Sequence, residues 1–333
     1  MGVITVEASR IREVVTMADA IAAVREAFRA YADGAYDLPP RTALLDGKFL
    51  VMSAHHRPSG SAVTKTLSLT QERRPAIVGS IAWTDLLRAD TLAIDAAPVT
   101  SLRTGAVVGV ATDLLASGSA ERMVLFGAGG QAADQVRAVH SVRPLRSLHV
   151  LTRRPEPGEA LLRILTQELP GVTLTAGPLP EHREGAASRK ALANADIICC
   201  ATPATAPLFA AGDVAERVHV NAVGSYRTSM RELPVELLAG ARVYVDSVEA
   251  ALEESGEIVD AVRAGVLRRD DLTELGTALL ASPGVGARAG VGRGADPDAG
   301  AGPSGRTVFK SVGLAIQDWA IADLLARRLL PPG

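Results

Sequence analysis

Cysteine is nearly absent from this chain of 333 residues, and its two cysteines, Cys199 and Cys200, are adjacent. Neighbouring residues of a strand point to opposite faces, so an unstrained disulfide between these two is not expected. We interpret them as small buried apolar residues in a reducing compartment. With these cysteines and six scattered histidines, no spacing typical of a zinc site occurs, and we expect no metal.

An excess of charge of either sign is also lacking. The formal net charge is −2, which gives no electrostatic reason to expect nucleic acid or an anionic membrane as a partner. No apolar run of about 18 residues, the length that could span a membrane, occurs; the apolar stretch 104–112 lies between Arg103 and Asp113. Residues 1–7 lack the apolar core of a signal peptide. We therefore expect a cytoplasmic protein.

Two different patterns of apolar residues divide the chain, whose length suggests two domains. Residues 16–32 have apolar side chains on one helical face and predict an amphipathic helix. Short strands separated by turn residues follow, which indicates an antiparallel sheet. From residue 123 onward strands alternate with helices, which is typical of a parallel, doubly wound sheet. The expected strands are 49–52, 62–69, 77–83 and 91–94 in the first region, and 124–126, 148–151, 172–176, 197–201, 218–223 and 243–246 in the second.

The domain boundaries follow from a helix at 100–116 and from an unusual segment near the end. Residues 282–305 are mostly Gly, Ala, Pro and Arg without periodicity, which predicts a flexible insertion to which we assign no function. Residues 307–311 are expected to begin a last helix that reaches Leu330 and returns the chain to the first domain. The expected domains are a discontinuous α+β domain, residues 1–116 and 307–333, and an α/β domain, residues 117–306.

A strand that leads directly into a glycine turn is the most informative motif. Residues 123–132 read Met-Val-Leu-Phe-Gly-Ala-Gly-Gly-Gln-Ala. Gly127 permits the tight turn, Gly129 lets a pyrophosphate approach the backbone, and Ala132 keeps the following helix close to the strand, as in the Rossmann dinucleotide fingerprint. The helix would direct its free N–H groups at the phosphates. The residues expected to hold the pyrophosphate are Gly127, Gly129, Gly130 and Gln131.

The end of the next strand predicts which dinucleotide binds. NAD-binding folds usually place an acidic residue about 20 residues after the fingerprint, where it bonds the ribose 2′-hydroxyl. Here the strand 148–151 is followed by Thr152, Arg153 and Arg154. A 2′-phosphate prefers guanidinium and hydroxyl partners, so we predict NADPH, with NADH as the alternative. The arginines could otherwise be a solvated charge pair.

Three cations of the first domain are in unusual positions. Lys65 lies on the apolar face of the strand 62–69, where a lysine must either reach solvent or find a buried anion. Arg103 lies near the start of the helix 100–116, where the helix dipole disfavours a cation. Arg41 follows two prolines on a rigid approach to the sheet. A structural ion pair would explain each alone, but together they suggest a pocket for a substrate carboxylate.

A second polar cluster follows a strand of the parallel sheet. Residues 221–227 read Asn-Ala-Val-Gly-Ser-Tyr-Arg and come at the carboxyl end of their strand, the edge at which open α/β sheets bind ligands. Ala201 and Thr202 end the preceding strand in the same way. We therefore expect Ala201, Thr202 and Val223 to face the cofactor.

Together these motifs resemble the ornithine cyclodeaminase/mu-crystallin family nearly from end to end. The most specific pieces are residues 102–106, 127–132, 221–233 and 245–247. The resemblance implies a Rossmann domain, a dimerising antiparallel-sheet domain with an active site between the two, and hence a homodimer. It also implies that Arg41, Lys65 and Arg103 hold the substrate carboxylate, with Lys65 near the reacting nitrogen.

Two departures from the family pattern bear on the reaction. Cyclodeaminases of this family have a glutamate in the strand before the lysine, whereas residues 49–52 contain none. They also have an aspartate just after the glycine of the turn at 221–224, where this chain has Ser225 and Tyr226. Without these groups, deamination of a diamino acid loses an acid/base group and a cation anchor. The chain therefore looks more similar to the mu-crystallin branch, which is associated with NADPH-dependent ketimine reduction.

We predict the reduction of Δ1-pyrroline-2-carboxylate or Δ1-piperideine-2-carboxylate to L-proline or L-pipecolate, with the nicotinamide supplying hydride. Lys65 and Arg103 are the expected catalytic residues, and Arg41 and Ser225 complete the expected substrate site. Three alternatives stay open: an ornithine or lysine cyclodeaminase with tightly bound NAD, an amino-acid or opine-type dehydrogenase, and a non-catalytic NADPH-binding protein. A role in proline metabolism would follow from the ketimine reaction.

Overall fold

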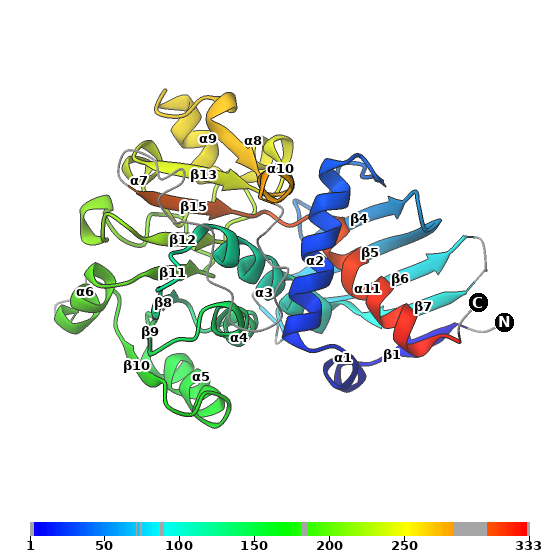
Figure 1. Ribbon diagram of the computed structural model, residues 1–333, viewed down its shortest axis with the longest axis horizontal. Coiled ribbons are helices and arrows are strands. Elements are labelled where there is room, and N and C mark those ends of the chain that lie inside the picture. Colours follow the sequence, from blue (N-terminus) through cyan, green and yellow to red (C-terminus); the bar gives the residue numbers. More distant parts are fainter. Residues whose placement is uncertain are drawn as a thin grey trace. The chain divides into compact units, whose positions relative to one another are not determined.

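The computed structural model describes residues 3–70, 72–73, 75–86, 90–180, 185–282 and 305–331. The chain divides into two compact units, residues 1–107 with 314–333 and residues 108–313 (Figure 1). Of the insertion expected at 282–305, residues 283–304 lie outside the described residues. No helix in the described part of the chain is both long and apolar enough to cross a membrane.

The first unit is built on a mostly antiparallel sheet, as the sequence predicts. Its strand order is β1-β7-β6-β5-β4-β2, with β3 paired to β4, and β1 pairs with β7 in parallel. The four expected strands are present as β4 to β7, whereas β1, β2 and β3 are too short for periodicity to reveal. The strands are β1 (Ile4–Val6), β2 (Tyr36–Asp37), β3 (Thr42–Leu44), β4 (Phe49–His56), β5 (Ser61–Leu69), β6 (Ile77–Asp85) and β7 (Thr91–Asp95).

Two helices far apart in the sequence pack together on this sheet. The last helix, α11 (Ala315–Leu329), contacts β4, β5 and β6 and lies beside α2 (Met17–Ala32). The N-terminus of α2 is fixed by a capping box, in which the Asp19 N–H donates to Thr16 Oγ1 and the Asp19 carboxylate accepts from the Thr16 N–H. Two further helices are α1 (Ala8–Val14) and α3 (Ala96–Leu115), which belongs to the first unit up to residue 107 and to the second from residue 108.

The second unit contains a parallel sheet with the order β10-β9-β8-β11-β12-β15-β13-β14. Its strands are β8 (Arg122–Phe126), β9 (Ser147–Leu151), β10 (Thr173–Gly177), β11 (Ile197–Cys200), β12 (His219–Ala222), β13 (Ala241–Val245), β14 (Leu272–Glu274) and β15 (Arg306–Lys310). Its helices are α4 (Ala132–Val142), α5 (Pro155–Glu168), α6 (Ala186–Ala193), α7 (Val235–Ala239), α8 (Val248–Glu254), α9 (Gly256–Arg263) and α10 (Leu275–Ala281).

Both faces of this sheet are covered, which confirms the doubly wound prediction. Along β8, Met123 and Leu125 pack into an apolar cluster with α4 and α5, while Val124 and Phe126 pack into a second cluster with α6 to α9. The adjacent cysteines separate in the same way, because Cys199 belongs to the first cluster and Cys200 to the second. Both thiols are free and fully buried, as expected.

One expected element is wrong. Residues 307–311 do not begin the last helix: Arg306–Lys310 form β15, which pairs with β12 and β13 in the interior of the parallel sheet. A short apolar run with Thr, Val and Phe fits a buried parallel strand as well as a helix start, and the run alone does not distinguish them. The helix begins at Ala315, beyond Gly313, so the second unit extends to residue 313.

Candidate active site

The glycine turn lies at the topological switch point of the parallel sheet, where the order of the strands reverses. From β8 the chain continues to β9 and β10 on one side, while β11 and β12 lie on the other. Open α/β sheets bind ligands outside the carboxyl ends of strands at such a point. Gly127, directly after β8, has φ +96°, and a Cβ there would lie 2.8 Å from the carbonyl oxygen of Ala201, directly after β11. Glycine is therefore required both by backbone conformation and by the close approach of β11.

The rest of the turn leaves room for a ligand. Gly129 and Gly130 are exposed, and a Cβ added to either would meet no atom within 4 Å. Gln131 precedes α4 without capping it through its side chain, and Ala132 is fully buried at the first position of the helix. Backbone N–H groups of an uncapped helix N-terminus beside an open glycine turn fit a pyrophosphate.

The end of β9 carries the residues expected to select the dinucleotide. The Thr152 hydroxyl donates to the Arg154 carbonyl oxygen at 2.7 Å, so this side chain shapes the turn. Arg153 and Arg154 are exposed directly after it. Two exposed guanidinium groups at this edge are suited to pairing with a 2′-phosphate.

Glu232, to which the sequence analysis assigned no role, joins the loops after β11 and β12. Its Oε1 accepts hydrogen bonds from the Thr202 N–H at 2.7 Å and from the Thr202 hydroxyl at 2.8 Å, and its Oε2 accepts from the Gly224 N–H at 2.8 Å. The carboxylate is fully buried, and burial raises its pKa. Val223 continues the same loop, with its N–H donating to the Cys200 carbonyl oxygen at 3.0 Å.

Ser225 lies in a buried group of charges. Its hydroxyl donates to the Glu257 carboxylate, whose oxygens are at 2.7 and 2.8 Å. The Lys310 ammonium donates to Ser225 Oγ at 2.7 Å and forms an ion pair with Glu257 at 3.3 Å. All three side chains are fully buried within the second unit. The departure at Ser225 therefore coincides with a compensated internal ion pair, and its contact with substrate stays a prediction.

In the first unit the expected cations do come together. Lys65 is fully buried in β5, opposite Met52 and Ile81, and its Nζ donates to Asp318 Oδ2 at 2.6 Å. Asp318 lies in the first turn of α11 and is itself fully buried. Burial lowers the pKa of Lys65 to about 8, the Asp318 carboxylate opposes this shift, and the positive charges of Arg103 and Arg41 add to it.

Arg103 reaches the same helix from α3. Its Nε lies 3.5 Å from Asp318 Oδ1, and its Nη1 donates to Gln317 Oε1 at 2.6 Å. Gln317 is fully buried, and its Nε2 has no hydrogen-bond partner among the described residues. Two buried cations that share one carboxylate, beside an unused amide donor, form a polar group suited to an anionic ligand.

The sequence analysis did not predict the roles of two buried carboxylates, Asp318 in the first unit and Glu232 in the second. It predicted that Lys65 would either reach solvent or find a buried anion, but that anion, Asp318, is 253 residues away in the chain. Glu232 and Lys310 lie inside segments that the resemblance used, yet nothing local indicates their partners. Asp318 is fully buried, but in the sequence it is one of several acidic residues expected on helices, and no local signal singled it out.

Comparisons with known proteins identify the family of the chain. The sequence pattern of the ornithine cyclodeaminase/mu-crystallin family matches residues 3–331. A Δ1-pyrroline-2-carboxylate reductase from Bacillus cereus is 30% identical, over 99% of this chain and 98% of the relative. An L-lysine cyclodeaminase from Streptomyces rapamycinicus is 33% identical, over 62% of this chain and 61% of the relative.

Solved structures share the whole fold. The Δ1-pyrroline-2-carboxylate reductase of Thermococcus litoralis, in complex with NADH and L-proline, superimposes with a TM-score of 0.84 at 28% identity, covering 98% of this chain and 97% of that one. An archaeal alanine dehydrogenase dimer with bound NAD gives a TM-score of 0.82 at 26% identity, covering 99% of this chain and 97% of that one. The chain therefore belongs to the ornithine cyclodeaminase/mu-crystallin family and is an oxidoreductase.

Proposed function

We propose that the protein reduces a cyclic ketimine, Δ1-pyrroline-2-carboxylate or its six-membered homologue, to L-proline or L-pipecolate. The buried group of Lys65, Arg103 and Asp318 is the observation that carries the proposal, because it combines a carboxylate-binding cation with a proton donor of suitable pKa. The similarity to Δ1-pyrroline-2-carboxylate reductases supports the same substrate class.

The proposed roles follow from charge and pKa. Arg103 and Arg41 neutralise the substrate carboxylate, and the Gln317 amide is available to it. Lys65, with a pKa of about 8, is an ammonium at neutral pH and protonates the ring nitrogen. The bound dinucleotide supplies the hydride that reduces C2 of the C=N bond. No nucleophile is needed, because no covalent intermediate is formed.

For the cofactor we propose binding at the glycine turn, through Gly127, Gly129, Gly130 and Gln131. Thr152, Arg153 and Arg154 are proposed to favour NADPH, and Ala201, Thr202 and Val223 to line the crevice. The two solved relatives hold NADH or NAD, so the preference for the phosphorylated form depends on the two arginines of this chain.

The deciding experiment measures NADPH and NADH oxidation with each cyclic ketimine, beside an ammonia assay on L-ornithine and L-lysine. Consumption of the reduced cofactor without ammonia release supports the proposal, and the ratio of the two ketimine rates gives the ring size. Ammonia release without net oxidation would instead make the chain a cyclodeaminase, despite the missing acidic residues at 49–52 and 225–226. Oxidation only with open-chain oxo acids and ammonia would indicate an amino-acid dehydrogenase.

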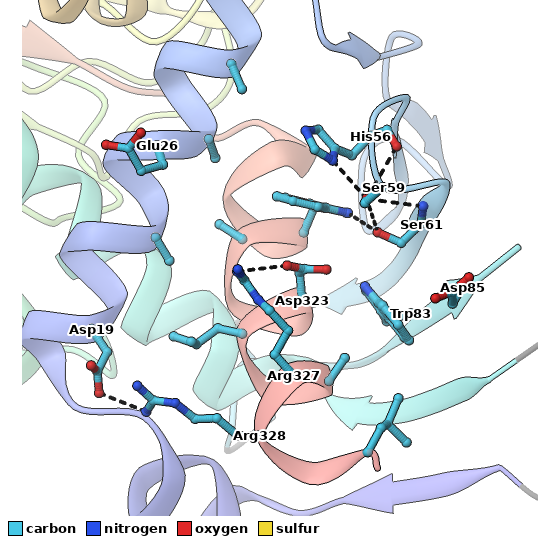
Figure 2. Close-up of a pocket in the computed structure, with 18 of the residues that line it drawn as sticks. Asp19, Glu26, His56, Ser59, Ser61, Trp83, Asp85, Asp323, Arg327 and Arg328 are labelled. Carbon is cyan, nitrogen blue, oxygen red and sulfur yellow. Dashed lines mark hydrogen bonds and ion pairs between the residues drawn. The ribbon is translucent and has the colours of Figure 1, made fainter. Parts of the chain in front are cut away.

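We also propose a homodimer, with a groove of the first unit as the contact surface. The groove has a volume of about 1050 Å³ and lies between α2, α11 and the ends of β4, β5 and β6 (Figure 2). Small side chains from both helices line it, which lets another helix approach closely; they are Ala22, Ala23, Ala27, Ala30, Ala320 and Ala326. The buried Tyr36 hydroxyl, which also lines the groove, has no hydrogen-bond partner among the described residues.

The groove carries charges of both signs. Asp323 pairs with Arg327 at 2.8 Å and Asp19 pairs with Arg328 at 2.9 Å (Figure 2). A two-fold axis through such a surface brings acidic groups of one copy to basic groups of the other.

A cytoplasmic location, expected from the reduced cysteines, stays a prediction.

A further inference from the structure

Glu232 has a connection to the glycine turn that its position in the sequence does not show. It lies 30 residues after Thr202 and 8 after Gly224, and it accepts hydrogen bonds from both. The chain around it is held to the same loop, since the Arg231 N–H donates to the Ala204 carbonyl oxygen and the Leu208 N–H donates to the Glu232 carbonyl oxygen. The carboxylate therefore connects the carboxyl ends of β11 and β12.

The Glu232 carboxylate fixes the orientation of the Thr202 side chain. Because the Thr202 hydroxyl and N–H both donate to Glu232, neither is directed at the crevice. The methyl group points the other way, and Thr202 Cγ2 would lie 3.1 Å from a Cβ at Gly127. The side chain thus presents an apolar wall to the glycine turn.

Gly224 packs directly against the Glu232 carboxylate, where a side chain would not fit. A Cβ at Gly224 would lie 2.5 Å from Glu232 Oε1 and would also collide with the backbone of Thr202. The loops after β11 and β12 are therefore in direct contact, and Glu232 bonds to both. Burial raises the pKa of Glu232, and the positive charge of Lys310 opposes this shift toward the neutral form. The ionised carboxylate is the form that accepts all these bonds.

We infer that Glu232 is a positioning residue of the cofactor site: it fixes Thr202 and Gly224 so that the wall opposite Gly127 has one shape before a dinucleotide binds. The inference rests on the proposed cofactor site. Pre-organisation of this kind lowers the ordering cost of binding, so its loss weakens affinity without removing any direct contact.

The test compares the dissociation constants of NADH and NADPH, measured by fluorescence titration, with the melting temperature for each variant. In Glu232→Gln the amide group opposes the Gly224 N–H, and we expect both dissociation constants to rise about tenfold, as for the loss of one hydrogen bond to a charged group. Thr202→Val keeps the shape of the wall and removes the hydroxyl donor, and we expect a smaller rise in the same direction.

Asp246→Asn is the matched control. Asp246 is also fully buried and its Oδ2 also accepts three hydrogen bonds, from Ser311 Oγ, Val312 N–H and Gly313 N–H, but it follows β13, away from Gly127. We expect this variant to lose stability and keep its cofactor affinity. Equal affinities in wild type, Glu232→Gln and Thr202→Val would overturn the inference, and Thr202→Val alone decides it if the glutamine variant does not fold. If the wild type binds neither dinucleotide, the proposed cofactor site fails, and the inference fails with it.

Discussion

Lys65 and Asp318 are both fully buried, so each depends on the other to compensate its charge. A buried ion pair is weak grounds for stability, because desolvation offsets much of the attraction between its members. Removing one partner leaves an uncompensated charge that must find another anion or lose its proton. The pair is therefore better explained by the reaction than by the fold.

Asp318→Asn tests this explanation through the pH dependence of turnover. The substitution removes the negative charge that opposes the effect of burial, so the pKa of Lys65 falls further below about 8. The proposed donor is the ammonium form, so kcat decreases as pH rises through this pKa, and in the variant the decrease begins at lower pH. At neutral pH we expect a loss of about a hundredfold. Lys65→Ala, as control, should lose turnover at every pH and still bind cofactor. A pH profile identical to that of the wild type would contradict the assignment.

The preference for NADPH depends on Arg153 and Arg154 together. In the double variant Arg153→Ala, Arg154→Ala the 2′-phosphate loses its charged donors, and we expect the dissociation constant of NADPH to rise roughly tenfold or more. That of NADH should change little, because its ribose has no phosphate at this position. Isothermal titration with both cofactors measures the difference. Equal losses would show that the arginines do not contact the 2′ position.

Single residues with unusual local surroundings were predictable from the sequence, but their partners were not. Lys65 is conspicuous because lysine rarely lies on an apolar strand face, whereas Asp318 is one of many acidic residues on helices. Glu232 has no local peculiarity at all. A pairing between residues 253 positions apart exists only once β5 and α11 are packed together.

At the scale of elements, the turn between β8 and α4 separates two kinds of glycine. Gly127 is required by the backbone, whereas Gly129 borders open space. The first should matter to folding and binding, and the second to binding only.

Gly127→Ala and Gly129→Ala form a matched pair of variants. The first places a side chain at positive φ, at a cost of about 1–2 kcal/mol, and against the Ala201 carbonyl oxygen, so we expect a lower melting temperature and weaker cofactor binding. The second should keep the melting temperature and weaken cofactor binding, because its methyl group takes the space proposed for the pyrophosphate. Thermal unfolding with and without NADPH distinguishes them. Unchanged binding in Gly129→Ala would place the cofactor elsewhere.

Most elements were found from the sequence, including the short buried strands of the parallel sheet. The helix α2 and the strands β4 to β13 lie close to their expected positions. The run 307–311 was assigned to a helix because a strand in the interior of a parallel sheet shows no alternation. Which neighbours a strand has decides this, and those neighbours, β12 and β13, come from elsewhere in the chain.

At the scale of the whole molecule, the groove beside α2 provides the test of the proposed dimer. Ala22 is exposed on α2 and lines the groove, so Ala22→Arg should not disturb the fold of the first unit but should block a second copy. Light scattering should give twice the monomer mass for the wild type and the monomer mass for this variant. Ser9→Arg, at an exposed position of α1 that does not line the groove, is the control and should remain dimeric. A dimer of unchanged strength in Ala22→Arg would move the interface to another surface.

The two neighbouring cysteines of β11 report on opposite layers of the second unit. Burial raises the pKa of Cys199 to about 12 and also raises that of Cys200, so neither is a thiolate in the folded protein. Alkylating reagents attack the thiolate, and they can reach it only after the helices on that side have separated from the sheet. Each thiol therefore reports the opening of one face of the parallel sheet. The order in which Cys199 and Cys200 are alkylated shows which layer of helices separates from the sheet first.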